Sequence, residues 1–108
     1  MVKHKTVFKG RLILSEKYVS SLLIFLFNNK NVHTSDLKNI SSYYQGIVKK
    51  AEELQDIGLI KIEEQNKPFR KKTFRLTDDG KKIAEKLTEI EDDLKDIIDK
   101  NSDNINFY

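Results

Sequence analysis

The sequence predicts a single, mainly helical α+β domain, and three patterns within its 108 residues lead to this prediction. Apolar residues recur at spacings of three and four between Tyr44 and Leu54, which is typical of an amphipathic helix. Residues 59–65 and 70–77 alternate apolar and polar side chains, as half-buried strands do. Residues 83–97 carry a heptad-like apolar repeat, which predicts a long final helix. A chain of this length builds one core.

The central helix, within residues 41–60, has a marked start and a marked stop. Ser42, followed three residues later by Gln45, is a capping-box pattern. Gly58 stands where a left-handed residue closes a helix at little steric cost. The residues expected on its outward face are Ser42, Gln45, Gly46 and Lys49, followed by Glu53 and Asp56. The acidic residues thus occur only at the C-terminal end of this face. That order suits a helix whose N-terminus enters a DNA groove, although a face that is merely solvated would look similar.

Two shorter helical segments are expected before it. Ser15 is the predicted N-cap of a first helix that reaches about Asn28 or Asn29. This helix is apolar nearly all round, so it needs cover from its own domain and from a second layer, which could be another subunit. After a short strand at 32–34, Ser35 is predicted to cap a brief helix over 36–40. A tight polar turn joins this helix to the central one, which makes a helix-turn-helix.

The two predicted strands form a hairpin around the breaker Asn66-Lys67-Pro68. The cations expected at its tip are Lys67, Arg70, Lys71 and Lys72. Such a basic hairpin could simply be a solubilising loop. Because it follows a helix-turn-helix directly in sequence, however, it is predicted to be a wing.

The final helix is predicted from Asp78 to about Lys100, roughly 34 Å long at about 1.5 Å per residue. Its expected apolar seam consists of Ile83, Leu87, Ile90, Leu94 and Ile97. The seam could lie back on the first helix, or it could form a coiled-coil dimer. We favour the homodimer, because the first helix also has apolar surface to cover.

Charge is distributed unevenly along the chain. Residues 1–50 hold nine Lys/Arg and two acids, whereas residues 78–108 hold five Lys/Arg and ten acids. This asymmetry suggests a surface for a polyanion on one side and a solvated or partner-facing acidic tail on the other. The expected organisation is a basic segment over 1–14, a DNA-binding unit over 15–77, a dimerisation helix over 78–100 and a tail over 101–108.

Several function classes are disfavoured by composition. The chain has no cysteine and only two isolated histidines, so no metal site, cofactor or catalytic thiol is expected. The acidic pairs are adjacent in sequence, whereas acid–base catalysis needs carboxylates that converge in a cleft, so no enzyme is expected. Without an apolar signal region or a membrane-spanning run, the sequence predicts a soluble, cytoplasmic protein that does not bind membranes.

Two motifs resemble those of winged helix-turn-helix transcriptional regulators of the MarR and PadR type, and of archaeal winged-helix proteins with a C-terminal coiled coil. LQDIGLI, residues 54–60, resembles the exit of that family's recognition helix. FRLTDDGKKIAEKL, residues 74–87, resembles its second wing strand and the start of its last helix.

The resemblance implies a homodimer that binds double-stranded DNA, often as a repressor. The base-facing positions it implies are Ser42, Tyr43, Gln45, Gly46 and Lys49, with Lys50 beside them, and the wing cations would contact phosphates. The short predicted wing leaves insertion into the minor groove open. An N-terminal dimerisation helix and an effector pocket are not evident, which makes control by a small-molecule effector doubtful. An architectural DNA binder with little sequence preference and a protein-interaction module remain alternatives.

Overall fold

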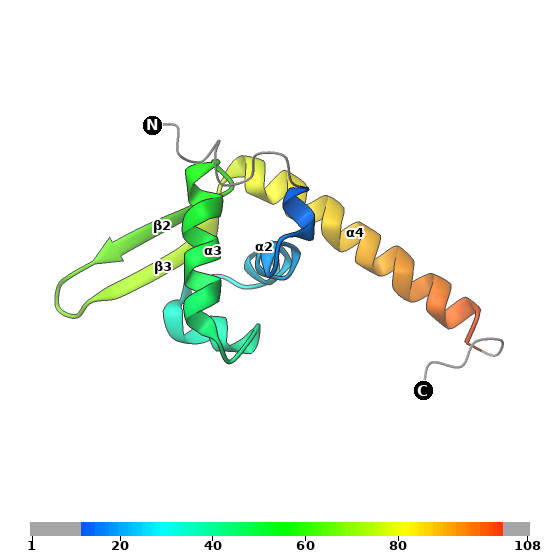
Figure 1. Cartoon of the computed structure of the whole chain (residues 1–108), viewed down its shortest axis with the longest axis horizontal. Coiled ribbons are helices and arrows are strands. Elements are labelled where there is room, and N and C mark those ends of the chain that lie inside the picture. The colour runs from blue at the N-terminus through cyan, green and yellow to red at the C-terminus, as the bar shows by residue number, and fades with distance from the viewer. Residues whose placement is uncertain (1–11, 103–108) are drawn as a thin grey trace.

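The first half of the domain contains one α-helix and several short elements (Figure 1). The computed structural model describes residues 12–102. It opens with a 3-10 turn, η1 (Ile13–Ser15), and the helix α2 (Val19–Asn28). The two-residue strand β1 (Val32–His33) and the 3-10 helix η2 (Thr34–Asn39) follow. The basic N-terminal segment predicted over 1–14 lies outside the described residues, apart from its last three positions.

The second half contains the elements that organise the molecule. Helix α3 (Tyr44–Asp56) leads into the hairpin of β2 (Ile60–Gln65) and β3 (Lys71–Leu76), and α4 (Asp78–Lys100) completes the fold. The three strands form an antiparallel sheet in the order β1-β3-β2. In Figure 1 the hairpin and the far half of α4 extend from opposite sides of the central body. The predicted short strand, hairpin and final helix are confirmed.

One apolar core connects the helices to the base of the sheet. Helix α2 packs against α3, α4 and β3, so its nearly continuous apolar surface is covered largely by its own domain. The predicted inward residues of the second wing strand, Phe74 and Leu76, are buried in this core. The buried apolar residues are Val19, Leu22, Leu23, Leu26, Val32, Leu37, Ile47, Ala51, Leu54, Ile60, Phe74, Leu76 and Ala84.

The junction between α3 and α4 fixes how the hairpin leaves the core. Gly58 has a φ of 88°, and the N–H groups of Gly58 and Leu59 donate to the carbonyls of Gln55 and Leu54, which is a Schellman motif. The Thr77 hydroxyl donates to the Gly58 carbonyl at 2.6 Å and accepts from the Gly80 N–H at 3.0 Å. One side chain thus caps α4 and ties its start to the end of α3.

Three predicted helix starts are wrong. Helix α2 begins at Val19, because Tyr18 adopts left-handed backbone angles that a helix running on from Ser15 could not contain. The segment after β1 is a 3-10 helix from Thr34, and the Asp36 carboxylate, rather than Ser35, accepts the His33 N–H at 2.9 Å.

The third wrong start is that of the central helix, which begins at Tyr44 without a side-chain cap. Gln45 is therefore in the second helical position and cannot complete a capping box with Ser42. The Ser41 hydroxyl instead accepts a hydrogen bond from the Tyr43 N–H at 3.2 Å. This bond forms a local turn, and the helix begins only after it.

The apolar seam predicted on α4 divides into two parts. Ile83 and Leu87 are half-buried against the core. Ile90, Leu94, Ile97 and the neighbouring Ile98 are 44–54% exposed. Only the second part is therefore available to another molecule. No helix within residues 12–102 is long and apolar enough to cross a membrane.

Candidate nucleic-acid interface

The outer face of α3 carries the predicted recognition residues. Ile47, Ala51 and Leu54 face the core and are fully buried, so the opposite side of the helix faces solvent. Gln45 and Lys49 are both exposed and lie one helical turn apart on that side. Ser42 and Tyr43 are exposed immediately before the first turn. An amide, an ammonium group, a hydroxyl and a phenol are therefore accessible at the N-terminal half of this helix.

Gly46 lies beneath the ring of Tyr43. A Cβ added at Gly46 would come within 2.7 and 2.8 Å of Tyr43 ring carbons and within 3.4 Å of the Tyr18 ring. These distances show that the missing side chain is what lets the Tyr43 ring lie on the helix. The sequence predicts Gly46 as a base-facing position, but in this structure it supports Tyr43 and is itself partly covered.

Lys50 does not lie with the exposed residues of α3. Its side chain is only 15% exposed, and its Nζ lies 2.8 Å from Glu53 Oε1 and 3.3 Å from Glu16 Oε1. Burial lowers the pKa of Lys50, but the hydrogen bonds and charges of the two carboxylates outweigh it and raise the pKa overall. Lys50 thus joins the turn before α2 to α3, and the sequence-based assignment of Lys50 to the DNA-binding surface does not fit this placement.

The hairpin places three of its four predicted cations at an exposed tip. Lys67, Arg70 and Lys71 are exposed, and only Arg70 has an ion pair within residues 12–102, a 3.4 Å contact with Glu64. Lys72 is set back in β3, where its Nζ lies 3.9 Å from Glu52 of α3. That contact occupies one of the acidic groups on the outer side of α3 and connects the helix to the hairpin.

Sequence reasoning missed one feature of the tip. Phe69 is 75% exposed between Pro68 and Arg70, although phenylalanine is normally buried. Its position in an otherwise polar and cationic loop is the signal that could have drawn attention to it.

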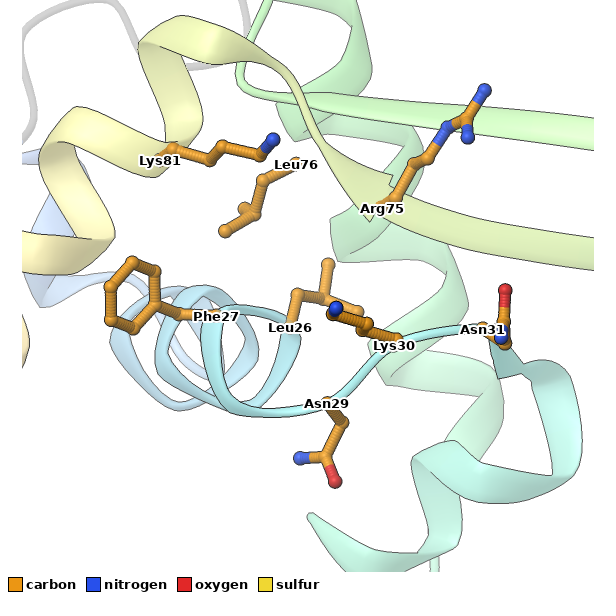
Figure 2. Close-up of a pocket in the computed structure, with 8 residues that line it drawn as sticks. All are labelled: Leu26, Phe27, Asn29, Lys30, Asn31, Arg75, Leu76 and Lys81. Atoms are coloured by element: carbon orange, nitrogen blue, oxygen red, sulfur yellow. The ribbon is translucent and has the colours of Figure 1, made fainter.

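A cavity of about 370 Å³ lies on another part of the surface, between the end of α2, β3 and the start of α4 (Figure 2). Its apolar lining is Leu26, Phe27 and Leu76, and Lys30 and Lys81 stand at its edge. Arg75 also borders it, but its guanidinium contacts Glu63 of β2 at 2.8 Å. No residue of α3 or of the hairpin tip lines this cavity, so it is separate from the candidate interface. No cluster of His and acidic side chains suited to a metal ion occurs within residues 12–102.

Comparison with solved structures identifies the fold. The chain is similar to a transcriptional regulator homologue from Pyrococcus horikoshii OT3, with 18% identity over 91% of this chain and 96% of that one and a TM-score of 0.64. The adhesin competence repressor AdcR of Streptococcus pyogenes is 14% identical over 94% of this chain and 74% of its own, with a TM-score of 0.73. The fold is a winged helix. A mutant of MepR from a multidrug-resistant S. aureus clinical isolate gives 16% identity over 92% and 73% of the two chains and a TM-score of 0.64.

The helix-turn-helix and the hairpin correspond to the parts of a winged helix. Helix α2 is its first helix, η2 its shortened second helix and α3 the helix that the fold presents outward, while β2 and β3 form the wing. The predicted winged helix with a long last helix is confirmed as a fold. No family model and no curated protein matches the sequence significantly.

Proposed function

We propose that this protein is a dimeric DNA-binding transcriptional regulator that acts as a repressor and is not an enzyme. The observation that carries the proposal is the pairing of an exposed Gln45–Lys49 face on α3 with a cationic wing tip, within a winged-helix fold. Two of the three similar structures are named as a transcriptional regulator homologue and as a repressor, which supports this choice.

The N-terminal half of helix α3 would lie in the major groove. The Gln45 amide can pair with both polar edge atoms of adenine, and Lys49 can donate to guanine. Lys67, Arg70 and Lys71 would contact phosphates of the flanking backbone, which position the protein without selecting sequence. Two of the three acidic residues of α3, Glu52 and Glu53, oppose this arrangement less strongly because they face Lys72 and Lys50.

A dimer would place two such surfaces on one duplex. The apolar stripe of α4, which we define as Ile90, Leu94, Ile97 and Ile98, lies beyond the part of the helix that packs on the core and repeats as a coiled-coil seam does. A second copy would cover this stripe with the same residues. Two α3 helices related by a two-fold axis would then read half-sites about one turn of DNA, ~34 Å, apart, or a multiple of that distance.

Two substitutions separate base reading from phosphate binding. Gln45→Ala is expected to cost about 1–3 kcal/mol on a selected duplex and little on random duplex, because it removes only an interaction with a base. Arg70→Ala should weaken binding to both duplexes alike and reduce the magnitude of the salt slope by roughly 0.9 for each phosphate that the variant no longer binds. Fluorescence anisotropy at several salt concentrations measures both quantities.

Lys86→Ala is the matched control, since it removes an exposed cation of α4 that is distant in sequence from α3 and the wing. It should leave the affinities and the salt slope nearly unchanged. If Gln45→Ala weakens binding to the selected and the random duplex equally, α3 does not read bases, and the architectural alternative describes the protein better. If neither Gln45→Ala nor Arg70→Ala has any effect, the candidate interface is not the DNA-binding surface.

A further inference from the structure

We propose that Phe69 is a wedge that inserts between base pairs in the minor groove and bends the bound duplex. The wedge depends on the proposed function, because it requires the wing to lie on duplex DNA. Phe69 is 75% exposed, so the ring contributes little to the chain's own core. It stands in the loop between β2 and β3, at the end of a hairpin that projects from the body of the molecule (Figure 1).

The loop that carries Phe69 is held on both sides. The Gln65 side-chain amide donates a hydrogen bond to the Lys67 carbonyl, and the Arg70 guanidinium donates to the Glu64 carboxylate at 3.4 Å. Below the loop, β2 and β3 remain paired up to Gln65 and Lys71. A tip braced in this way loses less conformational freedom when it binds than an unbraced loop would, so an aromatic ring on it is suited to insertion.

The surroundings of the ring indicate what it would contact. Lys67, Arg70 and Lys71 lie within two residues of Phe69, and neither lysine has an ion pair within residues 12–102. An apolar protein partner would bury the ring but leave these cations without counter-charges. The minor groove offers both an apolar contact for the ring and counter-charges for the cations. It is about 6 Å wide, has stacked bases at its floor and is bordered by phosphates. The geometry therefore favours duplex DNA as the occupant.

Insertion of an apolar side chain unstacks a base step and kinks the duplex by roughly 20–90° toward the major groove. The cost is lowest at pyrimidine–purine steps such as TA and CA/TG, which are the most flexible. Phe69 would thus add a second source of sequence preference, beneath the wing, to the base contacts of α3.

The bend can be measured on the full-length protein by energy transfer between dyes at the two ends of a selected duplex. The wild-type protein should shorten the end-to-end distance, and Phe69→Ala should reduce the bend angle by more than half. Phe69→Leu should keep most of the bend, since leucine also acts as a wedge. Lys67→Ala is the control, and it should lower the salt slope by roughly 0.9 while leaving the bend intact.

A second comparison uses the DNA itself. Replacing a flexible step under the wing by a stiff A-tract should weaken wild-type binding about tenfold and change the affinity of Phe69→Ala by less than about twofold. An equal bend with wild type and Phe69→Ala would overturn the wedge while leaving the proposed DNA binding intact. Loss of self-association on Phe69→Ala would also overturn it, because the ring would then serve a protein contact. Absence of any wild-type complex with DNA would instead refute the proposed function.

Discussion

We expect Leu94→Asp to convert the proposed dimer into a monomer. Leu94 lies in the middle of the apolar stripe of α4 and is 47% exposed in the single chain, so a carboxylate there is solvated in the monomer. In the dimer the same carboxylate would be buried in an apolar seam without a partner, at a cost of several kcal/mol. Light scattering should report half the mass of the wild-type particle, while circular dichroism should show an unchanged helix content.

Lys95→Asp is the matched control for this experiment. It introduces the same side chain at the adjacent exposed position, outside the apolar stripe, and changes the net charge by more. It should leave the dimer intact. If Leu94→Asp and Ile90→Asp both remain dimeric, the subunits associate through another surface, and the proposed role of α4 is wrong.

We expect Gly80→Ala to destabilise the fold strongly. A Cβ at Gly80 would lie 2.0 Å from the carbonyl oxygen of Leu59 and 3.0 Å from its carbonyl carbon. These are backbone atoms, and the same carbonyl accepts a hydrogen bond from the Thr77 N–H, so α4 would have to move away from the end of α3. The decrease in the free energy of unfolding should be at least about 3 kcal/mol, a large part of the 5–15 kcal/mol typical of a domain. Urea denaturation monitored by circular dichroism measures it.

Gly58→Ala provides the comparison, because it tests backbone strain without a steric clash. Apart from its two chain neighbours, no residue has an atom within 4 Å of a Cβ built at Gly58, but its φ of 88° is unfavourable for residues with side chains. The expected decrease in stability is about 1–2 kcal/mol. If Gly80→Ala lowers the free energy of unfolding by no more than Gly58→Ala does, the close approach of α4 to Leu59 does not constrain the fold.

Elements set by a repeating pattern could be predicted from the sequence. The predicted final helix, from Asp78 to about Lys100, agrees with the structure because its acidic first turn and apolar repeat both act locally. The exit of α3 is equally predictable, since Gly58 is needed at one particular backbone position. The helical period alone places Gln45 and Lys49 correctly on the outer face.

The features that sequence reasoning misses depend on contacts between distant residues. Glu53 is a local partner of Lys50, but nothing local in the sequence signals that Glu16 also reaches it, and the two carboxylates together hold Lys50 away from the exposed face. The apolar repeat of α4 is uniform in sequence, although the core covers Ile83 and Leu87 and leaves Leu94 exposed. The position of Phe69 in the cationic loop is visible in the sequence, but the 75% exposure of its ring becomes evident only in the folded chain.

The central claim, that this winged helix binds duplex DNA through α3 and a cationic wing, is tested most directly by a salt titration. Affinity for a random-sequence duplex should be measured by fluorescence anisotropy between 50 and 200 mM salt. If the dimer contacts roughly 6–10 phosphates, the affinity should fall by about 10³–10⁵ over this range. A response that is flat with salt, or an absence of binding at 50 mM, would contradict the claim and favour a role in protein interaction.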